Sequence, residues 1–130
     1  MTRRKLLTTT MLAGLAFVAT AKAANQARYD AASFAAAQAA GKPILVAVHA
    51  SWCPTCAKQK PIIDELAARP ENRDLMIFLV DFDSQKDIVK GFGVQMQSTL
   101  IAFHGKAERD RSTGATDAAV IGALVAKARS

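Results

Sequence analysis

The sequence predicts an α/β fold in which a mixed β-sheet is flanked by helices in three layers. Two apolar runs, 44–48 and 75–80, have the length and continuity of strands that are buried on both faces. A helical segment follows each run, and strands that alternate with helices pair in parallel. A polar segment after a glycine turn adds a hairpin near the C-terminus, so the sheet is expected to have one antiparallel edge.

The N-terminal half of the fold begins with a helix. An alanine-rich stretch, 29–40, is followed by Gly41, a residue typical of helix C-termini. The strand over 44–48 comes next. After it, apolar residues at helical spacing predict a second helix that runs to about Ala68.

The C-terminal half begins with the strand over 75–80. Ser84 is expected to cap a short helix that runs to about Lys90, with Asp87 as its capping-box partner. The remaining predicted elements are a strand over 99–103, a turn at His104-Gly105, an edge strand over 106–112 and a last helix that Thr116 opens.

The first 23 residues have the pattern of an export signal. A basic head, Arg3-Arg4-Lys5, precedes a mostly apolar stretch over 6–21, and Ala21-Lys22-Ala23 supplies the small residues of a cleavage site. The apolar stretch is shorter than the roughly 20 residues of a membrane-spanning helix, so a removed signal is favoured over an uncleaved anchor. The paired arginines resemble a twin-arginine signal. We therefore expect a signal peptide over 1–23, one domain over 24–130, and a bacterial periplasmic or secreted protein after cleavage near Ala23.

The charge of the chain is concentrated in this signal. The whole sequence has a net charge of +6, with 17 basic and 11 acidic side chains. Without the four basic residues of 1–23, 13 basic against 11 acidic side chains remain, a net charge of about +2. No basic patch of the kind that binds nucleic acid is left. We expect neither nucleic-acid binding nor stable membrane insertion.

The two cysteines of the chain, Cys53 and Cys56, are two residues apart. A disulfide that closes so short a loop restricts the unfolded chain very little, so this pair is better suited to react than to staple the fold. Cys53 lies where the second helix begins, with Pro54 in its first turn. The unpaired N–H groups and the positive end of the helix dipole favour a thiolate at Cys53, the nucleophile of disulfide exchange.

The other residues of this segment have secondary roles in the predicted chemistry. Cys56, one helical turn later and expected to be the more buried thiol, would attack the mixed disulfide and release the client. Trp52 would shield the site and offer a flat apolar surface to partner peptides, although simple core packing is the alternative. Pro54 and Thr55, between the cysteines, would tune the reduction potential.

The segment Trp52-Cys53-Pro54-Thr55-Cys56, between a strand and a helix, resembles the active site of the thioredoxin family. The resemblance covers about 29–128 and includes Pro61 in the helix and the last hairpin. The stretch 39–46 is also similar to the soluble domains of bacterial periplasmic interchange proteins. The resemblance implies a thioredoxin-like fold, a redox-active Cys53–Cys56 disulfide, protein thiol or disulfide substrates and a transmembrane electron-donor protein as a partner. We expect a monomer without a cofactor or metal.

Three positions depart from the family pattern. Ala47 and Leu79 stand where the family has a buried aspartate and its lysine partner, and Ser98 replaces the proline whose cis bond faces the disulfide. Proton transfer to and from Cys56 is then expected to be slower or to use another route. Water, His49, Asp81 and Asp83 are the candidates, and all three side chains follow strands.

Gln97 and Ser98 are expected to form part of the substrate-binding loop. A cis bond before a residue other than proline costs about 3–4 kcal/mol, so the Gln97–Ser98 peptide is expected to be trans. By resemblance this loop packs against the disulfide. Either the N–H or the hydroxyl of Ser98 could then reach the Cys53 sulfur, or the hydroxyl could face solvent.

Two other functions are compatible with the same residues. A metal site would use Cys53 and Cys56 with His49 and His104, but zinc takes four ligands, and His104 lies about 20 Å away at the far end of a strand. A redox-silent adaptor would use the fold only to bind a partner. Thiol–disulfide exchange is the favoured interpretation because the cysteines lie at a helix N-terminus.

Overall fold

The computed structural model describes Gly14 and residues 26–130. Apart from Gly14, the predicted signal peptide over 1–23 lies outside the described residues, as does its cleavage site. Within the described part of the chain, no helix has the length and apolar character needed to cross a membrane.

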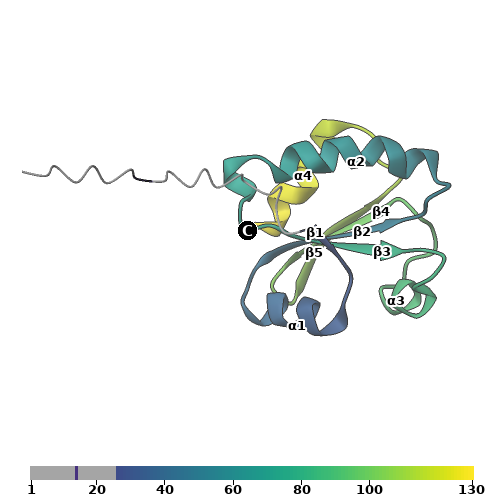
Figure 1. Cartoon of the computed structure of the whole chain (residues 1–130), viewed down its shortest axis with the longest axis horizontal. Helices are drawn as coiled ribbons and strands as arrows, with labels where there is room; N and C mark the ends of the chain where they lie inside the picture. The colour runs from purple at the N-terminus through teal and green to yellow at the C-terminus, as the bar shows by residue number, and fades with distance from the viewer. Residues whose placement is uncertain (1–13, 15–25) are drawn as a thin grey trace, which may run out of the picture.

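A five-stranded mixed sheet forms the middle layer, with the strand order β1-β3-β2-β4-β5 (Figure 1). Both β1 and β2 run parallel to β3, whereas β4 runs antiparallel to β2 and to β5. The strands are β1 (Gln26–Arg28), β2 (Pro43–His49), β3 (Met76–Asp81), β4 (Thr99–His104) and β5 (Ala107–Thr113).

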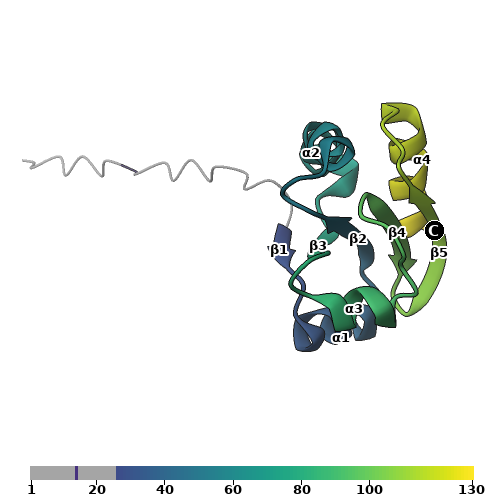
Figure 2. The ribbon, with the colours of Figure 1, turned by 90° about the vertical axis from the view of Figure 1, so that its right-hand side faces the viewer.

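Helices cover both faces of the sheet, which confirms the predicted three-layer α/β fold. Figures 1 and 2 show α2 and α4 on one face and α1 and α3 on the other. The helices are α1 (Ala31–Ala39), α2 (Pro54–Ala67), α3 (Lys86–Gly91) and α4 (Ala118–Ala128), with a short 3₁₀ turn at Pro70–Asn72.

Each face of the sheet has its own hydrophobic core. Because side chains alternate along a strand, Leu45 and Ala47 of β2 pack toward α2 and α4, whereas Val46 and Val48 pack toward α1 and α3. The second core contains a group of aromatic rings that contact one another edge to face or tilted: Tyr29, Phe34, Phe78, Phe92 and Phe103.

The topology places the site at the C-terminal ends of the two central parallel strands. The parallel strands β2 and β3 end side by side, with His49 in register with Asp81. The chain leaves β2 at His49 and begins α2 at Pro54, so the two cysteines lie just beyond the C-terminal end of β2. Ligands and catalytic groups commonly occupy this position in α/β sheets.

The structure corrects several predicted boundaries. The strand β1 was not predicted, because Gln26–Arg28 is short and polar and is held by its pairing with β3. The expected cap at Ser84 is wrong: its backbone N–H donates to the Asp81 carboxylate, and α3 begins after Gln85 without a side-chain cap. The last helix is capped by Asp117, one residue after the predicted Thr116.

Candidate active site

Cys53 is the N-cap residue of α2, as predicted, and Pro54 occupies the first turn. The backbone of Cys53 is extended, and its sulfur accepts a hydrogen bond from the backbone N–H of Cys56 at 3.1 Å. The sulfur therefore takes the place of a capping oxygen at the positive end of the helix dipole. Helix N-termini of this geometry favour negatively charged acceptors.

Cys56 is held in its protonated form. Burial, followed by a hydrogen bond to the side chain of Cys53, raises the pKa of Cys56 to about 11, and the backbone of Ala50 and Ser98 acts in the opposite direction. The Cys56 thiol and the Cys56 backbone N–H thus both interact with the Cys53 sulfur. Attack by Cys56 requires that its proton first be removed.

Both cysteines are buried, with exposed fractions of 4% for Cys53 and 8% for Cys56. The prediction that Cys56 is the more buried of the two is wrong. Ala50 packs with the two cysteines, and Phe82 contacts this small cluster from the loop after β3. Cys53 therefore presents little of its surface to solvent.

Trp52 lies at the surface beside the cysteines. Its side chain is 57% exposed, which excludes the alternative of simple core packing. The indole N–H donates to a carboxylate oxygen of Asp83 at 2.7 Å, and this contact fixes the ring. Of the two residues between the cysteines, Pro54 is exposed and Thr55 is half-buried.

The loop before β4 brings Ser98 to the site. The Gln97–Ser98 peptide is trans, as predicted, because no cis bond occurs within the described residues. Ser98 is buried and has a φ of 62°, in the left-handed region. Its backbone N–H donates to the carbonyl oxygen of Val48 at 2.8 Å and not to the Cys53 sulfur, which corrects one of the two contacts considered from the sequence. Gln97 is half-buried beside it.

A buried glutamine on α2, which the sequence analysis did not identify, supports this loop. Gln59 is 3% exposed, and its side-chain amide donates to the carbonyl oxygens of Ser98 at 3.1 Å and Ala115 at 2.8 Å. The signal in the sequence is a glutamine at a core position of the helix, between Cys56 and Ile63.

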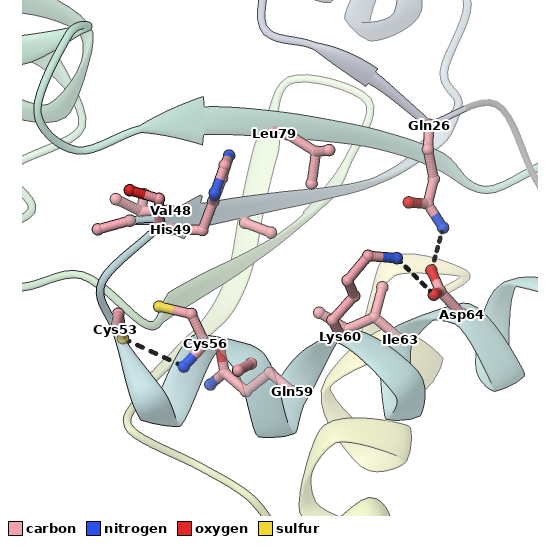
Figure 3. A pocket seen from close by; sticks show the side chains of 14 residues that line it. Gln26, Val48, His49, Cys53, Cys56, Gln59, Lys60, Ile63, Asp64 and Leu79 are labelled. Atoms are coloured by element: carbon pink, nitrogen blue, oxygen red, sulfur yellow. Dashed lines mark hydrogen bonds and ion pairs between the residues drawn. The ribbon is translucent and has the colours of Figure 1, made fainter.

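A pocket of about 230 Å³ lies between α2 and the sheet, directly beside the cysteines (Figure 3). Ala47 and Leu79, two of the three departures from the family pattern, both line it. At the end far from the cysteines, the carboxylate of Asp64 accepts hydrogen bonds from Lys60 at 2.8 Å and Gln26 at 3.0 Å. The pocket is therefore apolar in its middle and polar at both ends.

The three candidates for proton transfer occupy different positions. His49 lines the pocket. The Asp81 carboxylate accepts the backbone N–H groups of Ser84 and Asp83, and these hydrogen bonds, that of Ser84 first, lower its pKa, with a smaller contribution from the charge of His49. Asp83 is engaged by Trp52. Of these three side chains, His49 is the one that faces the pocket.

Of the residues of the alternative metal site, His104 is separated from Cys53, Cys56 and His49, which line one pocket. His104 lies at the opposite end of the antiparallel β4, where its Nδ1 is 2.9 Å from the carbonyl oxygen of Ala128. Among the residues that the structure describes, no group of three or more histidine, cysteine or acidic side chains could hold a metal ion.

Comparison with known proteins identifies a matching family and a similar solved structure. Residues 25–127 match the family model described as Thioredoxin. Trxlp from Edwardsiella tarda EIB202 is similar in structure, with a TM-score of 0.76 and 40% sequence identity over 78% of this chain and 98% of that chain.

Two curated proteins are also similar in sequence. Thioredoxin H-type from Brassica campestris is 35% identical over 80 residues, which is 62% of this chain and 63% of the relative. Protein disulfide-isomerase erp38 from Neurospora crassa is 41% identical over 71 residues, which is 53% of this chain and 19% of the relative. The chain therefore spans less than two thirds of the length of these curated relatives.

Proposed function

Because the chain belongs to the thioredoxin family, we propose that it is an exported thiol–disulfide oxidoreductase that exchanges a Cys53–Cys56 dithiol or disulfide with protein substrates. The main support for this proposal is the position of the Cys53 sulfur at the N-terminus of α2, where it accepts a hydrogen bond from the backbone N–H of Cys56 at 3.1 Å. This contact supports a nucleophilic thiolate at Cys53 beside a protonated partner thiol.

The exchange proceeds in two steps that conserve electrons. The Cys53 thiolate attacks one sulfur of a client disulfide, forms a mixed disulfide and releases the other client sulfur as a thiolate. Cys56 then loses its proton and attacks the Cys53 sulfur. The Cys53–Cys56 disulfide forms, and the client leaves with both of its cysteines reduced. The same steps in reverse oxidise a client dithiol.

The surface around the site supports a protein client. Trp52 and Met96 are large apolar side chains that remain 57% and 56% exposed, and they belong to the two segments that meet at the cysteines. Exposed aromatic and methionine side chains are typical of surfaces that bind other polypeptides. The buried position of Cys53 favours a client that places an extended segment against this surface.

Export and the electron donor follow from the sequence. The basic head, the apolar stretch and the small residues before Ala24 support a signal peptide over 1–23 and a mature domain over 24–130. In the periplasm, a transmembrane protein that passes electrons from the cytoplasm across the membrane would reduce the Cys53–Cys56 disulfide to the dithiol. The mature protein would then act without a bound cofactor.

Reduction of insulin disulfides by the purified protein, with dithiothreitol as electron donor, tests the proposal. Cys53→Ser is expected to abolish the activity. Cys56→Ser is expected to stop the reaction after the first step and to accumulate mixed disulfides that migrate as larger species without reductant. Full activity of Cys53→Ser would contradict the assignment of the nucleophile.

A further inference from the structure

The resolving step needs a proton acceptor for Cys56. Burial raises the pKa of Cys56, so few Cys56 thiols are ionised at neutral pH. The strands beneath the cysteine contribute Ala47 and Leu79 to the pocket, and neither carries an ionisable group. The acceptor must therefore come from elsewhere in the pocket or from bulk solvent.

The polar groups at the far end of the pocket are poor acceptors. The side chain of Lys60 is 74% exposed and paired with Asp64, and an ammonium group has no lone pair with which to accept a proton. The pKa of Asp64 is lowered, first by the hydrogen bond from Lys60 and then by that from Gln26. A carboxylate held in this way is a weak base.

His49 is placed differently. It is the last residue of β2, and Figure 3 shows its imidazole and the Cys56 side chain at one end of the pocket, with Lys60 and Asp64 at the other. Imidazole is the side chain that takes up and releases a proton near neutral pH. From β3, the carboxylate of Asp81 lies in register with His49 and interacts with its charge.

We propose that His49 accepts the proton of Cys56 during the resolving step, through water in the pocket, and so replaces the missing buried carboxylate. The inference rests on the proposed exchange function. A pocket of about 230 Å³ has room for several water molecules, each of which occupies about 30 Å³ in the liquid. The proton moves from the Cys56 sulfur to the His49 imidazole, the Cys56 thiolate attacks the Cys53 sulfur, and the departing client thiolate is protonated by the imidazolium.

The charged and titratable groups that face this step are few. From α2 they are Cys53, Lys60 and Asp64, and from β3 the group is Asp81. Asp83, in the loop after β3, is occupied by the Trp52 indole. With His49 as acceptor, the resolving rate should rise through the pH range of imidazole and then level off. With solvent as acceptor, it should rise about tenfold per pH unit until the Cys56 thiol itself ionises.

A pH jump isolates the resolving step. The reduced protein is treated at pH 4 with one equivalent of dithiodipyridine, which forms a mixed disulfide at Cys53 and releases one thiopyridone. Mixing with buffers of pH 6–11 starts the attack by Cys56, which is followed as release of the second thiopyridone. We expect His49→Gln to slow this release at least about tenfold at pH 7. Near pH 11, the release rates of the variant and the wild type should become equal. Added imidazole should restore the rate of the variant.

His104→Gln is the matched control, because His104 is bonded to the Ala128 carbonyl and does not line the pocket. It is expected to keep the wild-type rate at every pH. Unchanged release by His49→Gln at pH 7, or a wild-type rate that rises continuously to pH 11, would overturn the role of His49. A wild-type protein that never releases the second thiopyridone would instead refute the proposed exchange function. If His49→Gln does not fold, the wild-type pH profile alone decides between the two acceptors.

Discussion

The side-chain amide of Gln59 donates a hydrogen bond to the carbonyl oxygen of Ser98, across the interface between the active-site helix and the loop before β4. The same amide donates to the carbonyl of Ala115 before the last helix. One buried side chain therefore joins three segments that are far apart in the sequence. The position of Ser98 relative to the cysteines depends on this contact.

Gln59→Met should destabilise the fold, because it removes this donor from the buried carbonyl oxygen of Ser98 and the partly buried carbonyl oxygen of Ala115. Loss of a donor to buried acceptors costs about 1–3 kcal/mol. Urea unfolding followed by circular dichroism measures the change. Gln95→Met, at an exposed glutamine, is the control and should alter the free energy of unfolding by less than about 0.5 kcal/mol. Equal stabilities of the two variants would contradict the structural role of Gln59.

Ser98→Gly and Ser98→Pro should differ strongly in stability. Glycine adopts the φ of 62° without steric cost, so the glycine variant should lie within about 1 kcal/mol of the wild type. Proline has a φ near −65° and lacks the N–H that Ser98 donates to Val48, and it should destabilise the fold by about 3 kcal/mol or more. Thermal unfolding of the reduced proteins compares them. A proline variant as stable as the glycine variant would show that the loop adopts another conformation.

The stability of the reduced protein should fall at alkaline pH. The folded state raises the pKa of Cys56 from 9.0 to about 11, mainly by burial, so it binds the thiol proton more tightly than the unfolded chain does. This stabilisation is complete below pH 9 and is lost as the pH rises to about 11, by at most about 2 kcal/mol. Urea unfolding under reductant at pH 8 and pH 11 measures the loss. Cys56→Ser should lack this component, and an identical pH dependence in the variant would contradict it.

Trp52→Ala should weaken the reaction with protein clients more than with small disulfides. The exposed indole offers contact area to a polypeptide but is not needed for the exchange chemistry, so kcat/KM for insulin should fall about tenfold. Reduction of bis(2-hydroxyethyl) disulfide should be nearly unchanged. Val120→Ala, at another exposed apolar residue on α4, is the control. Equal losses with both substrates would instead indicate a damaged site.

Export in a bacterial host should yield a mature protein that begins at Ala24, because Ala21-Lys22-Ala23 has the small residues that signal cleavage requires. Intact-mass analysis of the periplasmic protein measures the N-terminus. Replacement of Arg3 and Arg4 by lysine should block export if the twin-arginine route is used. Unchanged export of that variant would assign the protein to the general secretory route, and a species that retains both arginines would indicate an anchor.

The parts of the fold with strong local signals were predictable. The continuous apolar runs at β2 and β3 are recognisable because both faces of these strands are covered. The N-cap position of Cys53 follows from Pro54 and from the strand before it. In contrast, Gln26–Arg28 is a strand only because β3 lies beside it, and no pattern in three residues, two of them polar, shows this.

The finer geometry of the site depends on contacts between distant segments. Ser84 has the right residue type for a cap, but the carboxylate of Asp81 takes its N–H, a competition that spacing alone does not reveal. The similar burial of the two cysteines results from the packing of Ala50 and Phe82 around them. The N–H of Ser98, one of the donors considered for the Cys53 sulfur, is likewise engaged by a distant segment, because it donates to the carbonyl oxygen of Val48.

The two outer strands of the sheet bear on self-association. An edge strand presents unpaired N–H and C=O groups to which another chain can add, and long apolar edges promote aggregation. Here one edge strand is β1, which has three residues. The other is β5, whose exposed side chains include the charged residues Glu108 and Arg111. The pairing of β5 with β4 is also interrupted by an irregularity at Ala102/Phe103. Both edges therefore oppose sheet extension between molecules.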